Sequence, residues 1–180
     1  MNPLQRLWDE HRQAVWLDFI ERGMLESGGL ARLADDGVRG VTSNPSIFEK
    51  AIAGGGAYRA AVAALLAAEP ELPTQDLYEA LAIDDIRSAA DVLRPLWEAS
   101  AAGDGFVSLE VSPHLADDAA GTVAEGRRLW AAVARPNLMI KVPATPAGIP
   151  AIEELLAAGV NVNATLMFSL GHYEAVAQAF

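Results

Sequence analysis

Lys141 is the residue of this sequence with the clearest chemical potential. It is one of only two lysines in 180 residues, and it lies in an apolar run, Asn137–Thr145, that is typical of a buried strand. Burial disfavours the ammonium form, and a neutral amine can attack a carbonyl to form a Schiff base. The alternative is that the methylene stem lies along apolar surface while the ammonium stays in water.

Polar side chains also stand at the carboxyl ends of the other expected strands. Together with Lys141, these residues are Asp18, Asn44, Glu110, Asn163 and Thr165. In parallel α/β folds such ends share one face, which carries the active site of barrels and the ligand crevice of open sheets. Any one of them alone is commonly a loop residue or a satisfied core group, but the set predicts a polar pocket.

The residue types in this pocket suit aldol chemistry. An amine that forms an iminium provides an electron sink when the neighbouring carbon–carbon bond breaks, and carboxylates move protons during dehydration and cleavage. This chemistry needs no metal and no cofactor, and we expect none. The three histidines are far apart in sequence and show no metal-ligand spacing, although His114, four residues after Glu110, could line the pocket.

The elements that must position these residues alternate between short apolar segments and longer helical ones, as in parallel βα units. The expected strands are Ala14–Asp18, Gly37–Asn44, Phe106–Val111, Leu138–Val142 and Val160–Leu166. The expected covering helices are Leu25–Ala34, Tyr58–Glu69, Gln75–Ala99, Asp117–Ala134 and Ile149–Ala157. The pattern predicts one α/β domain over residues 1–180, with about five βα units.

Composition and missing motifs exclude several functions. A formal charge of −11 argues against nucleic-acid and acidic-membrane binding, and the absence of cysteine excludes disulfides and thiolate sites. Val41–Pro45 lacks the glycines of a serine-hydrolase turn, and no Gly-x-Gly-x-x-Gly follows the first strand. Met1–Glu10 carries charges where a secretory leader would be apolar, so we expect a soluble, cytoplasmic protein.

Five segments of the sequence form a recognisable set: Val15–Asp18, Gly40–Phe48, Val107–Val111, Met139–Thr145 and Asn161–Ser169. Their motifs Thr-Ser-Asn-Pro and Ile-Lys-Val-Pro are specific when they occur together. In this order along the chain, the segments resemble the transaldolase family, and its longer bacterial form is the most similar. The resemblance implies a TIM-type (β/α)8 barrel enzyme of the pentose phosphate pathway, with sugar phosphates as substrates. Such an enzyme transfers a dihydroxyacetone unit from sedoheptulose 7-phosphate or fructose 6-phosphate to an aldose phosphate.

The resemblance also implies a role for each candidate residue. Lys141 would be the Schiff-base lysine, and Glu110 would pass protons through a water held partly by Thr165. Asp18 would take the proton of the hydroxyl at the cleaved bond. Asn44 and Asn163 would hold the bound dihydroxyacetone carbons.

Length separates this chain from a complete barrel, which needs about 250 residues. The sequence ends at Phe180, within what would be the fifth helix, so three strands and the phosphate-binding serine and arginine would lie beyond it. An incomplete barrel would leave its first and fifth strands as open edges, which invites a homo-oligomer or a complementing fragment. The alternatives are a related class I aldolase, a catalytically silent half-barrel that self-associates and, for the fold, an open flavodoxin-like sheet.

Overall fold

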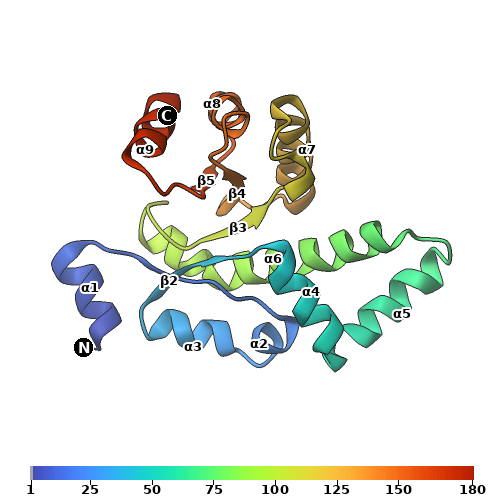
Figure 1. The fold of residues 1–180 in the computed structure, drawn as a ribbon. Helices are drawn as coiled ribbons and strands as arrows, with labels where there is room; N and C mark the ends of the chain where they lie inside the picture. Colours follow the sequence, from blue (N-terminus) through green and yellow to red (C-terminus); the bar gives the residue numbers. More distant parts are fainter. Residues whose placement is uncertain (1) are drawn as a thin grey trace. The chain divides into compact units, whose positions relative to one another are not determined.

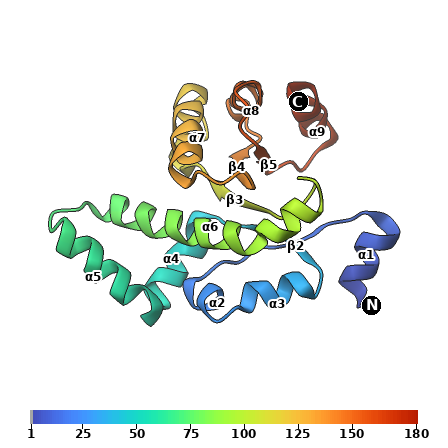
Figure 2. The ribbon, with the colours of Figure 1, turned by 180° about the vertical axis from the view of Figure 1, so that it is seen from behind.

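The structure is a computed structural model and describes residues 2–180 (Figures 1 and 2). Its contacts divide the chain into two compact units, Met1–Val107 and Ser108–Phe180, and each unit is described by itself.

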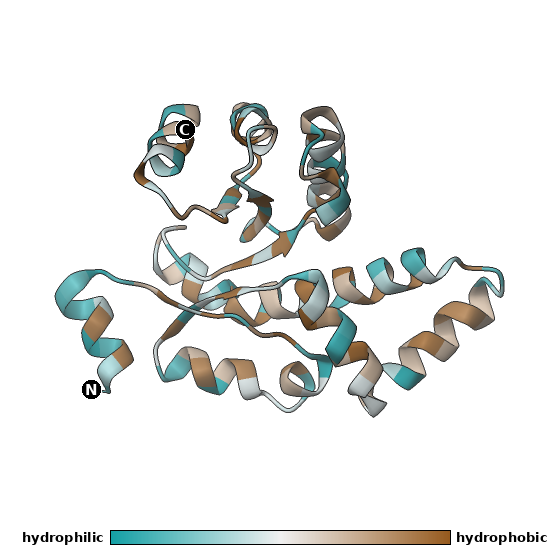
Figure 3. Ribbon diagram, viewed as in Figure 1, coloured by the Kyte–Doolittle hydropathy of each residue, from teal (hydrophilic) through white to brown (hydrophobic). Residues whose placement is uncertain are grey.

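The first unit contains two complete strands and the helices that connect the second of them to the third strand. Its elements are α1 (Pro3–His11), β1 (Val15–Leu17), α2 (Arg22–Glu26), α3 (Gly29–Asp35), β2 (Val38–Thr42), α4 (Pro45–Gly54), η1 (Gly56–Tyr58), α5 (Arg59–Ala68) and α6 (Thr74–Ala99). Strand β1 pairs with β2 in parallel, with Leu17 opposite Val41. In Figure 3, α5 carries mostly hydrophobic colours. Apolar side chains of α5 pack against a core cluster made by Ala51, Tyr58 and Leu81.

Two helical features before β2 differ from the expectation. The expected helix Leu25–Ala34 is two helices, because the chain turns at Gly28, whose φ of +71° is left-handed. Helix α1 was not expected, although its start carries a readable signal. Asn2 accepts from the Gln5 amide and the Gln5 side chain accepts from the Asn2 amide, with Pro3 in the first turn.

The second unit alternates strands and helices regularly. Strand β3 (Phe106–Glu110) crosses the boundary, and η2 (Pro113–Leu115), α7 (Ala119–Val133), β4 (Leu138–Pro143), α8 (Gly148–Ala157), β5 (Val162–Thr165) and α9 (Leu170–Ala179) follow. Helices α7, α8 and α9 stand in a row in both views (Figures 1 and 2). Helix α8 packs on β4, on β5 and on both neighbouring helices.

The strands are neighbours in chain order, β1-β2-β3-β4-β5. Within the first unit, the Gly105 amide donates to the Arg39 carbonyl and places the start of β3 beside β2. Within the second unit, the Val111 amide donates to the Lys141 carbonyl, and β4 pairs in parallel with β5. This order confirms the prediction of an incomplete TIM-type barrel. A flavodoxin-like sheet would have its first strand between the second and the third.

Strand β3 shows how the two sides of a strand differ. Val107, Leu109 and Val111 are at most 7% exposed, and the intervening positions are Ser108 and Glu110.

Among residues 2–180 no single helix is long and apolar enough to span a membrane. The bent pair Pro45–Gly54 and Gly56–Ala68 passes that test only when taken together.

Candidate active site

Lys141 lies in β4, the longest strand, and forms an ion pair with Glu110 at the end of β3. Its Nζ is 3.3 Å from Glu110 Oε2, and the two side chains are 11% and 17% exposed. The neighbouring backbones are joined by the hydrogen bond from Val111 to Lys141. The structure therefore brings the candidate amine and a candidate carboxylate together.

Asn163 lies on β5 directly opposite Lys141 in the parallel register. Its Nδ2 donates to the hydroxyl of Ser108 on β3 at 3.1 Å, so its amide group has a defined orientation. Ser108 is fully buried and was not among the candidate residues. The alternation of a strand could have identified it, because it stands two residues before Glu110 and thus on the same face.

Thr165 is the last residue of β5, opposite Pro143 of β4. Its carbonyl accepts from the Ala144 amide at 2.8 Å, which keeps the carboxyl ends of the two strands together. Because side chains of a strand alternate, Thr165 shares the face of Asn163. The second unit thus places four of the six candidate residues toward the carboxyl ends of neighbouring strands.

The loops that follow β3 and β4 are joined just outside this cluster. The Thr145 hydroxyl donates to the Ala116 carbonyl at 2.5 Å and accepts from the Gly148 amide at 2.9 Å. Gly148 has no room for a side chain, since a Cβ there would lie 1.9 Å from the Pro143 carbonyl oxygen. The chain after Lys141 is therefore held in one tight path.

Asp18 and Asn44 belong to the first unit, at the carboxyl ends of the paired strands β1 and β2. Asp18 follows the last residue of β1 and is exposed. Asn44 caps α4, because its side chain accepts from the Ile47 amide at 3.0 Å and Pro45 occupies the first turn. Both residues therefore lie just beyond their strands, in the segments that lead into α2 and α4.

A cavity of about 390 Å³ lies at the other end of β2. Gln5, Trp8 and Asp9 of α1 line it together with Gly37 and Arg39. The Arg39 guanidinium lies 3.8 Å from the centre of the Trp8 ring and pairs with the buried Asp104. The Arg39 guanidinium of this cavity is thus already paired with Asp104 and stacked on Trp8. The cavity lies at the amino end of β2, away from Asn44.

Fold and site together define a class of protein: a parallel α/β chain of the barrel type that presents a lysine paired with a carboxylate at its strand ends. The family model described as transaldolase/fructose-6-phosphate aldolase matches residues 15–180. The chain belongs to this family.

Curated relatives agree with this assignment. A transaldolase of Thiobacillus denitrificans is 52% identical over 169 residues, which are 93% of this chain and 46% of that protein. A transaldolase of Thermobifida fusca is 53% identical over 180 residues, or 99% of this chain and 48% of that protein. Transaldolase 2 of a Nostoc species is 47% identical over 165 residues, or 91% and 43%. The chain spans about half the length of the curated relatives it matches.

Proposed function

We propose that this chain carries the Schiff-base part of a transaldolase site, with a ketose phosphate as substrate. The observation that supports the proposal most is the pairing of Lys141 with Glu110 at 3.3 Å on neighbouring strand ends, with Asn163 in register beside the lysine. A partly buried amine next to a carboxylate is the pairing that imine formation needs, because a proton must leave the amine and later reach the departing water.

In the proposed reaction the Lys141 amine adds to the carbonyl carbon of the ketose and gives a carbinolamine. Glu110 then delivers a proton to the carbinolamine hydroxyl, through a water held by Thr165, and water leaves as the iminium forms. Asp18 takes the proton of the hydroxyl at the bond to be cleaved. The electron pair of that bond moves into the iminium, and the aldose phosphate is released.

The dihydroxyacetone unit stays on Lys141 as an enamine until an aldose phosphate accepts it by the reverse of these steps. Asn44 and Asn163 would hold its hydroxyl groups meanwhile. One N–H of Asn163 Nδ2 is engaged with Ser108, so its second N–H and its Oδ1 would be available to a substrate hydroxyl. We place this reaction in the pentose phosphate pathway, as the resemblance implies, and in the cytoplasm, whose reducing conditions fit a sequence without cysteine.

Reductive trapping tests the proposal directly. The chain is incubated with fructose 6-phosphate and borohydride, its intact mass is measured, and the modified peptide is mapped. Lys50, the other lysine, is exposed on α4 and serves as an internal control. We expect a dihydroxyacetone adduct on Lys141, none on Lys50, no adduct in Lys141→Met and the wild-type adduct in Lys50→Arg. A folded chain that stays unmodified would refute this proposal and favour a silent half-barrel.

Release of the bound dihydroxyacetone unit, followed without borohydride, separates a transaldolase from a related aldolase. A transaldolase should pass dihydroxyacetone to an added aldose phosphate and release little of it without an acceptor. An aldolase would release free dihydroxyacetone in both cases.

We also propose that this chain associates with a partner through exposed apolar side chains. Strand β5 ends the strand order, and large apolar side chains near it and on α9 are exposed. They are Leu166, Phe168, Leu170, Tyr173 and Phe180, with exposed fractions from 53% to 94%. Such a patch favours association with a second copy or with a fragment that carries the remaining strands.

A further inference from the structure

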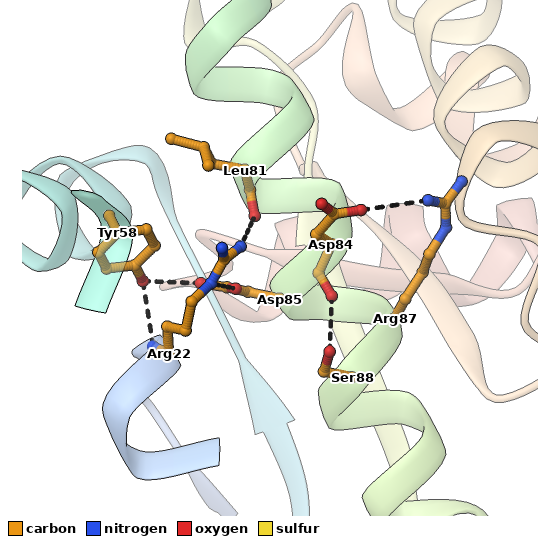
Figure 4. Close-up of polar contacts among 7 residues, drawn as sticks. All are labelled: Arg22, Tyr58, Leu81, Asp84, Asp85, Arg87 and Ser88. Atoms are coloured by element: carbon orange, nitrogen blue, oxygen red, sulfur yellow. Dashed lines mark hydrogen bonds and ion pairs between the residues drawn. The ribbon is translucent and has the colours of Figure 1, made fainter. Parts of the chain in front are cut away.

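A buried polar cluster in the first unit joins three segments that lie far apart in sequence (Figure 4). Arg22 Nε donates to Asp85 Oδ1 at 2.7 Å, and the Tyr58 hydroxyl donates to Asp85 Oδ2 at 2.7 Å. The Arg22 backbone amide donates to the same Tyr58 hydroxyl at 3.1 Å. These contacts form a closed ring, which we name the Asp85 clamp and define as Arg22, Tyr58 and Asp85.

The clamp lies in the core and not on the surface. The side chains of Arg22 and Asp85 are 14% and 2% exposed, and Tyr58 is 2% exposed. Burial raises the pKa of Asp85, and the hydrogen bonds from Tyr58 and Arg22 oppose this increase. By contrast, the next ion pair on the same helix, Asp84 with Arg87, is 55% and 40% exposed. A buried carboxylate is costly unless it is paired and hydrogen-bonded, so its retention in this core calls for a role.

The hydrogen bond from the Arg22 amide to Tyr58 supports the loop that carries Asp18. Strand β1 ends at Leu17, so backbone pairing with β2 does not extend to Asp18. The loop after it is fixed by Ile20, which is fully buried, and by Arg22. Helix α2 begins at Arg22 without a side-chain cap from its own sequence, and the Tyr58 hydroxyl accepts the Arg22 amide instead. Tyr58 therefore fixes the far end of the loop that carries Asp18.

Tyr58 also connects α6 to helix α4, which begins directly after Asn44. Asn44 caps the start of α4, and Tyr58 lies in η1, just after the end of that helix. The Tyr58 ring packs with Ala51 of α4 and Leu81 of α6, while its hydroxyl is bound to Asp85. The segment that starts at Asn44 is thus attached to α6 through the same tyrosine.

We propose that the Asp85 clamp is a positioning device that fixes the loops of Asp18 and Asn44 on α6. In this role Arg22, Tyr58 and Asp85 are positioning residues that act through Asp18 and Asn44. The functional meaning of the clamp rests on the function proposed above.

Nuclear magnetic resonance of the sugar-free chain tests the clamp independently of any chemistry at Lys141. Tyr58→Phe removes one hydroxyl and keeps the ring, and Tyr173→Phe makes the same change at an exposed position as a control. In Tyr58→Phe we expect the Asp18 carboxyl carbon and the Asn44 side-chain amide signals to shift or broaden. Amides of residues 18–22 and of the first turn of α4 should exchange roughly tenfold to a hundredfold faster. Tyr173→Phe should change none of these.

Two results would overturn the proposal. One is a Tyr58→Phe chain whose Asp18 and Asn44 signals match the wild type. The other is faster exchange of equal size in every element, which is the mark of lower global stability alone. Arg22→Lys keeps the charge but loses the fork of the guanidinium, and it provides the same comparison if Tyr58→Phe does not fold. A failure of borohydride trapping would refute the proposed function while leaving these signals unchanged.

Discussion

Lys141 and Glu110 form an ion pair, so substitutions of these two residues should have strongly non-additive effects on the free energy of unfolding. Two unit charges 3.3 Å apart attract by about 5 kcal/mol at an effective dielectric constant of about 20. Desolvation of both groups removes much of this energy, because the side chains are only 11% and 17% exposed. We therefore expect a net coupling of roughly 1–3 kcal/mol.

A double-mutant cycle measures this coupling as the free energy of unfolding in urea, followed by circular dichroism. Lys141→Met leaves a poorly solvated carboxylate without its counter-charge, and Glu110→Gln leaves the ammonium without one. Each single variant should lose about 1–2 kcal/mol, whereas the double variant should lose only about 1 kcal/mol in total, which gives the coupling of roughly 1–3 kcal/mol. The double variant should nevertheless form no borohydride adduct, so that stability and chemistry are separated.

An exposed ion pair of the same unit provides the control. Arg127 Nη2 lies 3.0 Å from Glu154 Oε1, but these side chains are 51% and 57% exposed. Their coupling should be at most about 0.5–1 kcal/mol, because water screens the pair. If the coupling of Lys141 and Glu110 is no larger than that of this surface pair, the reasoning from burial and distance is wrong.

Three further predictions concern other parts of the chain. Burial, together with the hydrogen bond to Asp85, raises the pKa of Tyr58 above its ordinary value of 10.0, so the native state keeps a proton that the unfolded state loses. The unfolding free energy should therefore fall as the pH rises above 10.0, with tyrosinate absorbance appearing as the fold is lost. The opposite slope, or an unchanged profile in Tyr58→Phe, would contradict this. Gly148→Ala should cost roughly 1–3 kcal/mol and reduce trapping on Lys141, since its Cβ would meet the Pro143 oxygen; unchanged urea unfolding would disprove the clash. Light scattering should show self-association that Phe168→Asp with Leu170→Asp reduces, and a wild type that is monomeric at all concentrations would count against an apolar docking surface.

The strands were predictable because their apolar runs are short and are bounded by clear breaks. All five occur where expected, with ends that differ by up to two residues. The proximity of Lys141 and Glu110 followed from the rule that parallel strands end at one edge. Ser108 was missed although strand alternation places it on the face of Glu110, and its contact with Asn163 of β5 became visible only in the structure.

The Asp85 clamp could not be predicted from the sequence. Arg22 and Asp85 are 63 positions apart, and neither periodicity nor a local motif links them. Asp85 even weakens the apolar pattern of the buried face of α6, where a helical wheel would place another hydrophobic residue. The structure explains this carboxylate, because Arg22 after the β1 loop and Tyr58 of η1 both donate hydrogen bonds to it.

The candidate site residues depend on two different kinds of support. Lys141 and Asn163 lie within strands, so backbone pairing fixes them, and a slip of one residue would turn both side chains to the helix-covered face. Asp18 and Asn44 lie beyond their strands, where no ladder of hydrogen bonds holds them. A residue in such a position needs a side-chain anchor elsewhere in the core, and the Asp85 clamp is that anchor in our proposal. Variants of the clamp should therefore disturb bond cleavage, which needs Asp18, more than imine formation on Lys141.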